Sequence, residues 1–241
     1  MCTVTFIPVL DGTVLTFSRD ENINRPLAIP PKVYKQFGKK MVFPQDPISN
    51  GSWIIADENG TIACLLNGAF VKHERKESYA KSRGLVLLDF FRYASIPEFL
   101  DSYTFFNIEP FTMIVVNNGI HEIRWTGREI SYKKLSENCP HIWSSATLYS
   151  EEISEKRNTW FKKWLSECET IDGEQTRQFH HQAGEGNPLI DLKMKRGDIR
   201  TLSITTIHST ENEVQLSYED LRVNGSHDTV SLAIKKDAVH G

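Results

Sequence analysis

Three residues near the start of the chain are of types that could carry out nucleophilic chemistry together. Cys2 opens an apolar run over residues 2–7, and a second apolar run over residues 13–17 leads directly into Arg19 and Asp20. The Asp-Gly pair between the two runs is typical of a tight hairpin turn. We therefore expect the end of the second strand, with its guanidinium and carboxylate, to lie beside Cys2.

Removal of the initiator Met would give Cys2 both a thiol and a free α-amine. Cytosolic aminopeptidases remove Met1 when the next residue is small, as Cys is. The amine titrates at about 7.7–8 and a free thiol near about 8.5, so one residue would supply a nucleophile and a weak base. Arg19 would favour the thiolate, and Asp20 would orient the amine. The alternative is that Cys2 is a buried packing residue of an ordinary strand.

Short motifs in a fixed order resemble those of one protein family over residues 1 to about 207. They are Met1-Cys2, Ser18-Arg19-Asp20-Glu21, Arg25-Pro26, Gly51-Ser52-Trp53, Asn59-Gly60 followed by Leu66-Asn67, Ser82-Arg83-Gly84, and Ile199-Arg200-Thr201. This series resembles the NRDE family, also called the transport-and-Golgi-organisation-two family. That family is similar to the N-terminal nucleophile (Ntn) hydrolases, among them bile-salt hydrolase and penicillin V acylase.

The resemblance implies a fold and a reaction. The fold is α+β, a four-layer αββα sandwich of two antiparallel sheets between helices. The reaction is hydrolysis of a linear amide, or alternatively a thioester, through an acyl-enzyme on Cys2. Asn67 would stabilise the oxyanion, Arg200 would be a second cation near the thiolate, and Trp143 and Ser145 would contact the substrate. Position alone favours a turn residue for Asn67 and an ordinary strand-end residue for Arg200.

Three departures from the family patterns bear on this interpretation. Ser18 stands where the family has Asn, and Ser145 stands where it has the Asn of a Ser-Asn-Ala motif. In bile-salt hydrolases the acid lies three residues after the Arg, where this chain has Asn22, so Asp20 is our candidate by position. The Ser145 departure supports a second hypothesis, a non-enzymatic protein that binds a hydrophobic ligand such as haem or acyl-CoA in lipid or haem handling or trafficking. A retained Met1 would favour it as well. A third hypothesis pairs Cys2 with Cys64 in a metal or redox site.

Composition and sequence patterns argue against several other classes of protein. The formal net charge is −3, so the sequence lacks the excess of positive charge that is typical of nucleic-acid-binding proteins. No apolar run approaches the roughly 18 residues of a membrane span, and no signal peptide is visible, so we expect a cytoplasmic protein. The four cysteines lack CxxC spacing, which predicts neither a disulfide framework nor a zinc site. We expect one domain over residues 1–241 with no cofactor; homo-oligomers remain open.

Apolar periodicity and turn signals predict the elements that must position these residues. The expected strands cover residues 53–56, 61–66, 111–116, 122–125, 129–132, 141–145, 201–207, 213–218 and 229–234. The expected helices cover residues 85–94, a short segment from 96, 151–168 and 174–183. In the third of these helices the charged residues are expected to face solvent.

Two further segments are expected to be irregular or exposed. Residues 22–50 hold five of the ten prolines and are expected to be a long irregular loop, either roofing an active-site cleft or forming an exposed connection. Residues 72–83 are dense in mixed charge and predict a solvated loop. His180 and His181 lack metal-binding spacing and are expected at the surface.

Overall fold

The strand that begins at Cys2 lies inside one of two β-sheets. In the computed structural model, which describes residues 2–235, β1 (Cys2–Val9) pairs antiparallel with β2 (Gly12–Asn22). The register places Cys2 opposite Arg19, which confirms the predicted hairpin. The second strand extends beyond the apolar run, so Arg19 and Asp20 belong to it rather than to a following loop. The expected removal of Met1 concerns a residue outside those that the structure describes.

Within residues 2–235 the chain forms two seven-stranded antiparallel sheets and four helices. The first sheet has the order β10-β1-β2-β12-β13-β14, with β11 beside β12; its further strands are β10 (His141–Ser144), β11 (Lys195–Arg196), β12 (Ile199–Thr210), β13 (Glu213–Asp220) and β14 (His227–Ala233). The second sheet follows chain order; its strands are β3 (Ile29–Gln36), β4 (Lys39–Gln45), β5 (Ile54–Asp57), β6 (Ile62–Asn67), β7 (Phe111–Val116), β8 (Ile120–Trp125) and β9 (Ile130–Leu135). The helices are α1 (Arg83–Phe90), α2 (Ile96–Ser102), α3 (Glu151–Glu167) and α4 (Gly173–Gln182).

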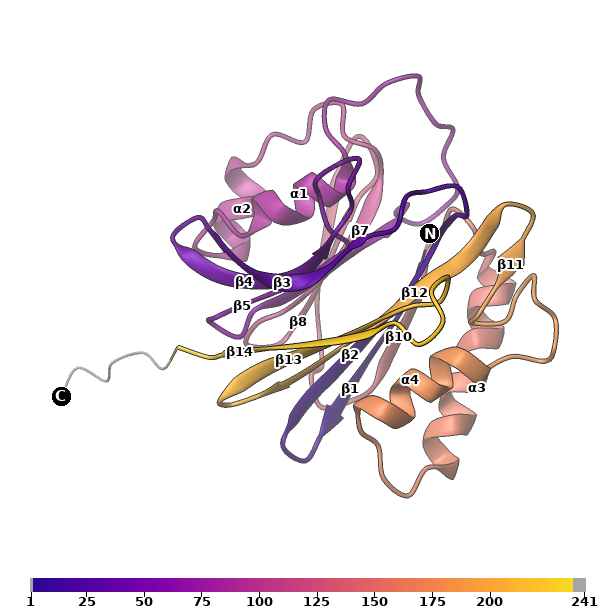
Figure 1. Ribbon diagram of the computed structural model, residues 1–241. Coiled ribbons are helices and arrows are strands. Elements are labelled where there is room, and N and C mark those ends of the chain that lie inside the picture. Colours follow the sequence, from indigo (N-terminus) through magenta and orange to yellow (C-terminus); the bar gives the residue numbers. More distant parts are fainter. Residues whose placement is uncertain (1, 236–241) are drawn as a thin grey trace.

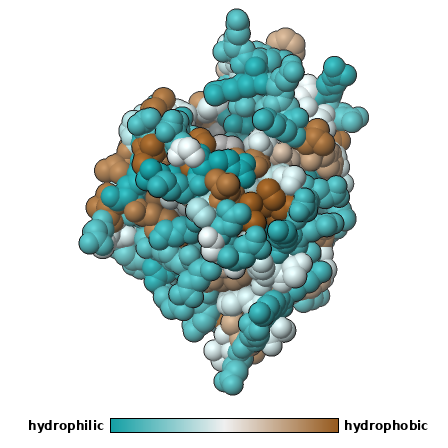
Figure 2. Space-filling model, turned by 90° about the vertical axis from the view of Figure 1, so that its right-hand side faces the viewer, coloured by the Kyte–Doolittle hydropathy of each residue, from teal (hydrophilic) through white to brown (hydrophobic). Residues whose placement is uncertain are grey.

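The sheets stack face to face, and helices cover their outer faces (Figure 1). The pair α1 and α2 lies against the second sheet, and the pair α3 and α4 against the first. A continuous apolar core joins the sheets, with Val4, Phe6 and Phe17 from one side meeting Ile54 and Leu66 from the other. The face shown in Figure 2 is mostly hydrophilic, with apolar groups only in small clusters. The predicted four-layer sandwich is confirmed. No helix within residues 2–235 is long and apolar enough to cross a membrane.

The expectation of a long irregular loop over residues 22–50 is wrong for most of that segment. Residues 29–36 and 39–45 form the hairpin of β3 and β4. Pro30 and Pro31 fit because β3 is the edge strand of its sheet, where a residue without an N–H breaks no ladder on its open side. The register also shifts between Ile29 and Lys32, where the two prolines lie. Only the two ends of the segment remain irregular, and both approach Cys2.

Local signals explain where the helices begin. Ser82, Ser95, Ser150 and Asp172 cap α1 to α4, each accepting a hydrogen bond from a backbone N–H of the first turn. The caps confirm the predicted helices to within a few residues. In α3 the acidic Glu151 and Glu152 also fall in the first turn, where they complement the helix dipole.

His180 corrects the expectation that both histidines of α4 lie at the surface. Its ring is fully buried, with Nδ1 2.7 Å from Ser18 Oγ and Nε2 2.9 Å from Thr5 Oγ1. Adjacent helical residues point in different directions, so only one of the pair faces the sheet, and His181 contacts Glu219 at a partly exposed position. The ring of His180 thus ties α4 to β1 and β2 directly behind Cys2.

The buried ring of His180 predicts a pH dependence of stability. Burial lowers the pKa of His180 to about 3, whereas an imidazole in the unfolded chain titrates near about 6.5. As the pH falls the unfolded chain therefore takes up the proton first. The contribution of the neutral His180 ring to the free energy of unfolding is complete above about pH 6.5. It decreases by up to about 1.4 kcal/mol per pH unit as the pH falls from there toward the pKa of the folded protein.

This dependence is measurable by urea unfolding over that pH range for the wild type and His180→Gln. The amide can bond the same hydroxyls but does not titrate, so the variant should have a shallower slope. Equal slopes in the two proteins would show that His180 is not the titrating group.

Candidate active site

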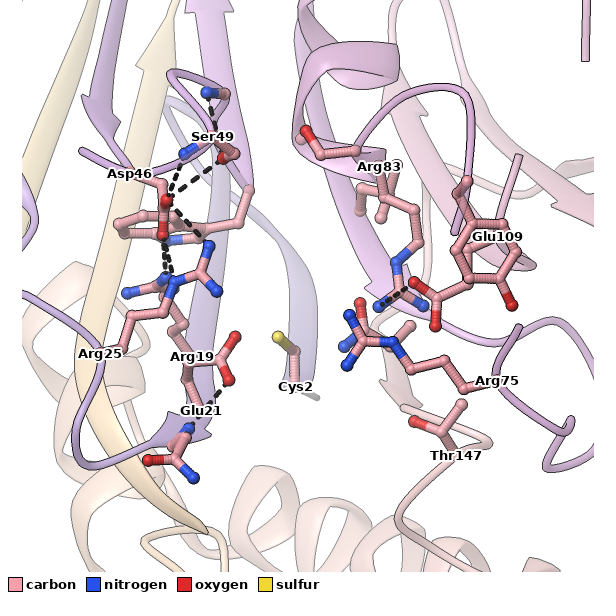
Figure 3. A pocket seen from close by; sticks show the side chains of 18 of the residues that line it. Cys2, Arg19, Glu21, Arg25, Asp46, Ser49, Arg75, Arg83, Glu109 and Thr147 are labelled. Atoms are coloured by element: carbon pink, nitrogen blue, oxygen red, sulfur yellow. Dashed lines mark hydrogen bonds and ion pairs between the residues drawn. The ribbon is translucent and has the colours of Figure 1, made fainter. Parts of the chain in front are cut away.

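Cys2 stands at the wall of a cavity of about 660 Å³. The cavity is lined by the ends of β1 and β2, by the turn after β4 and by the segment between β6 and α1. Figure 3 shows the thiol pointing into the space between two charged walls, one carrying Arg19 and the other Arg83. The predicted solvated loop over residues 72–83 is therefore a wall of this cavity as well as a surface segment.

The thiol of Cys2 is almost completely enclosed by protein, with only 4% of the residue exposed. Burial raises the pKa of the Cys2 thiol, while a hydrogen bond from the Asp20 backbone and the positive charge of Arg19 act in the opposite direction without overcoming it. Cys64 is also a buried free thiol in the same core, and burial raises its pKa too. Among the residues described, no group of three or more His, Cys, Asp or Glu residues is placed to hold a metal ion.

Arg19 is fixed in place from two directions. Its Nη2 donates to Asp46 Oδ2 at 2.7 Å, and its guanidinium lies 4.2 Å from the ring centroid of Trp53. The same carboxylate accepts two further hydrogen bonds from Arg25, at 2.8 and 2.9 Å. Burial opposes the ionised carboxylate, but the two guanidiniums and the backbone of Ser49 hold the pKa of Asp46 well below its usual range. Neither Asp46 nor Trp53 was a candidate from the sequence.

Asp20 lies at the cavity but turns its carboxylate toward the helix layer. Side chains alternate along a strand, so Asp20 and Arg19 face opposite sides of the sheet. Tyr149 donates to Oδ2 and Thr201 donates to Oδ1 of Asp20, each at 2.7 Å. Burial raises the pKa of Asp20, and the charge of Arg157 together with these hydrogen bonds opposes that shift. These contacts hold the carboxylate of Asp20 in one orientation close to Cys2.

Arg157 is the main correction to the predicted helix 151–168, whose charged residues were expected to face solvent. Its side chain is fully buried and donates to Thr3 Oγ1 at 2.6 Å and to two backbone carbonyls of residues 190–191. Its guanidinium stacks 3.6 Å from the ring centroid of Tyr149. The residue spacing does indicate this burial, because Arg157 lies four residues after Ile153 and four before Phe161, on the apolar face of the helix.

The opposite wall of the cavity is built around Arg83. Its Nη2 lies 3.1 Å from Glu109 Oε2, and its Nη1 donates to the carbonyl of Pro110 at 3.2 Å. His73 approaches the other oxygen of Glu109 at 3.2 Å. Arg75 comes from the same segment, and its side chain lies beside Arg83 in Figure 3.

The remaining candidates from the sequence fall into two groups. Asn67 lines the cavity at the end of β6. Ser145 is 1% exposed and holds main-chain groups: its N–H donates to Cys2 O at 2.9 Å, and its Oγ donates to Asn67 O at 2.6 Å. Trp143 is buried in the core and donates to Glu122 at 2.8 Å. Arg200 lies opposite Glu21 in the sheet. None of Trp143, Ser145 and Arg200 belongs to the described lining of the cavity.

Comparison with known proteins adds a family and a fold. The family model described as Transport and Golgi organisation 2 matches residues 1–213. Conjugated bile acid hydrolase from Clostridium perfringens is similar in structure, with a TM-score of 0.58 at 9% identity over 98% of this chain and 97% of that one. Penicillin V acylase from Agrobacterium tumefaciens gives a TM-score of 0.56 at 9% identity, covering 97% and 86%. The Caenorhabditis elegans orthologue of N-acylethanolamine-hydrolyzing acid amidase gives 0.56 at 12% identity, covering 86% and 92%. No curated protein sequence matches the chain significantly.

Removal of Arg157 should be strongly destabilising. An Arg157→Met variant keeps a similar volume but removes a positive charge that stabilises the buried carboxylate of Asp20, together with the hydrogen bonds to Thr3 and to residues 190–191, at a cost of about 3–5 kcal/mol of unfolding free energy. The double variant Arg157→Met/Asp20→Asn should recover part of that loss. Arg92→Met, at a 60% exposed ion pair, should cost at most about 1 kcal/mol.

Denaturant unfolding of the wild type, Arg157→Met, Asp20→Asn and the double variant measures these differences as a double-mutant cycle, with Arg92→Met as the exposed control. Additive effects of the Arg157 and Asp20 substitutions would show that the two charges are not coupled.

Proposed function

We propose, on the premise that the chain belongs to the Transport and Golgi organisation 2 family and has an Ntn-hydrolase-like fold, that Cys2 is the nucleophile of an amide hydrolase. The observation that carries the proposal is the position of Cys2: it begins the central strand hairpin, and its thiol points into a charged cavity facing a fixed Arg19. Likeness at this level of identity supports the fold, so the reaction rests on the geometry of the site.

The first half of the reaction would form a thioester. After loss of Met1, the α-amine of Cys2 takes the thiol proton, and the sulfur attacks the carbonyl carbon of the substrate. Arg19 stabilises the thiolate in a region where burial otherwise keeps the thiol protonated. The side chain of Asn67 donates to the oxyanion of the tetrahedral intermediate. The ammonium then gives its proton to the leaving nitrogen as the carbon–nitrogen bond breaks.

The second half would release the acyl group. The free α-amine takes a proton from water, the resulting hydroxide attacks the thioester carbonyl, and the thiolate leaves and is reprotonated by the ammonium. Asp20, held by Tyr149 and Thr201, keeps the amine oriented through both halves. A thioester substrate would follow the same steps with a thiol leaving group.

Three candidates from the sequence change their proposed role. Ser145 bonds the main chain of both Cys2 and Asn67, so we assign it to positioning the nucleophile and the oxyanion donor rather than to substrate contact. Arg200 and Trp143 take no step in the reaction, since neither lines the cavity.

Because both sheets share one core, we also propose that the chain acts as a single domain. A free N-terminal thiol is preserved in a reducing compartment, which makes the cytoplasm the proposed place of action.

The alternative is a protein that binds an acyl or hydrophobic ligand without turning it over. Its charged lining makes the cavity a poor site for a wholly apolar ligand, because burial of those charges would go uncompensated. The raised pKa of the Cys2 thiol favours this alternative for a chain that retains Met1, where no amine is present at Cys2 to accept the proton.

Substitution of Cys2 separates the two functions. Intact mass should show the purified protein without Met1, and iodoacetamide near neutral pH should label Cys2 faster than the exposed Cys139. Across a panel of linear N-acyl amides, Cys2→Ala should abolish hydrolysis, whereas Cys139→Ala should leave it unchanged. Undiminished hydrolysis by Cys2→Ala would refute the mechanism, and a wild type lacking Met1 that hydrolyses nothing in the panel would support the binding protein.

Asn67 should contribute to catalysis more than to folding. An Asn67→Ala variant loses one donor to the oxyanion, so kcat should fall about 10²–10³-fold with little change in KM. Thermal unfolding should differ little from that of Asn138→Ala, a substitution at an exposed position. An unchanged kcat would return Asn67 to the role of a turn residue.

A further inference from the structure

The wall of the cavity opposite Arg19 carries more positive than negative charge. The segment between β6 and α1 contributes Lys72, Arg75, Lys76 and Lys81 to the lining, and Arg83 follows at the start of α1. The lining as a whole holds seven Arg and Lys side chains against five Asp and Glu. The cavity therefore has an excess of positive charge, carried on this wall by side chains that are exposed, as Arg75 is, or half-buried, as Arg83 is.

The ion pairs show where this excess lies. Asp46 pairs with both Arg19 and Arg25, Glu109 pairs with Arg83, and Asp89 pairs with Lys81. Arg75 forms no ion pair with any residue in the range 2–235. Burial and the nearby charge of Arg75 both lower the pKa of Arg83, while Glu109 opposes this shift. Of the two neighbouring guanidiniums, only that of Arg83 is therefore paired with a carboxylate.

We propose that Arg75 and Arg83 form a binding site for an anionic oxygen group, a carboxylate or a phosphate, carried by the compound that Cys2 attacks. A planar guanidinium binds such groups through two parallel hydrogen bonds, and a pair of guanidiniums offers matched donors. The inference rests on the proposed function for what this group is attached to. Binding of an anion by Arg75 and Arg83 depends only on the charge and position of these side chains, and it does not require that Cys2 turns over a substrate.

The rest of the lining agrees with a polar, charged ligand. The cavity volume of about 660 Å³ is large enough for a small organic molecule. Few apolar side chains reach the cavity, and the largest, Trp53, is covered by the guanidinium of Arg19. An anionic group on the Arg75 side would leave the rest of the molecule extending toward the thiol, since Figure 3 shows Cys2 between the two walls.

A pair of alkylating reagents that differ in charge tests the site without a substrate. Iodoacetate and iodoacetamide react alike with thiols, but only the first is an anion. The ratio of their rates at Cys2, divided by the same ratio at exposed Cys139, should exceed one in low salt. It should fall about three- to tenfold in Arg75→Gln, fall with added salt, and stay unchanged in Arg128→Gln at an exposed position.

A second measurement does not require a reactive Cys2. At constant ionic strength, inorganic phosphate or acetate in place of chloride should raise the thermal midpoint of both the wild type and Cys2→Ala, because a ligand that binds the folded state stabilises it. Arg75→Gln should lose this rise, and the more effective anion identifies the group as phosphate or carboxylate. Equal alkylation ratios in wild type and Arg75→Gln, with no rise from either anion, would overturn the proposal. Loss of hydrolysis alone would not bear on it.

Discussion

The buried carboxylate of Asp20 is the constraint around which this fold is organised. A charge that is removed from water must be paired and hydrogen-bonded, and the cost of leaving it alone is several kcal/mol. Here Tyr149 and Thr201 donate to it, and Arg157 supplies the opposite charge from α3. Those partners come from the α3 region and from β12, up to 181 residues away from Asp20 along the chain, so these interactions form only when β2, β12 and the α3 region assemble.

The same principle extends along the outer face of the first sheet. Most sheets present apolar side chains to the helices that cover them, but here part of the interface is made of hydroxyls. Thr3 is met by Arg157, and Thr5 and Ser18 are met by His180, each within hydrogen-bond distance. Each polar contact fixes the register of a helix against the hairpin more narrowly than apolar packing would. The hairpin therefore presents Cys2 and Arg19 on the inner face at defined positions.

The sequence anticipated what depends on local pattern and missed what depends on long-range pairing. The hairpin at Cys2, the meander over residues 111–132 and the helices followed from alternation, turn residues and caps. The hairpin of β3 and β4 was missed because prolines indicate breaks unless the strand is known to lie at an edge, which is a tertiary property. His180 and Asp46 were missed because their partners are 162 and 27 residues away. The burial of Arg157 could have been predicted from helical spacing. A charged residue at such a position, however, normally argues against assigning an apolar face to that part of a helix.

The environment of Cys2 bears on which group could act as the base in the proposed mechanism. Burial raises the pKa of the thiol, and Arg19 is partly neutralised by Asp46, so the surroundings alone do not produce a thiolate. The proposed attack would therefore require a base next to the sulfur. The one imidazole in the described lining of the cavity, that of His73, lies on the opposite wall, where its Nε2 is engaged by Glu109. The α-amine of Cys2 would meet this requirement, since it is joined to the thiol by two carbon atoms and, with a pKa of about 7.7–8, is in the neutral amine form in a minority of molecules near neutral pH. In the proposed mechanism, removal of Met1 would therefore supply both the base for the thiol and the ammonium group that Asp20 would orient.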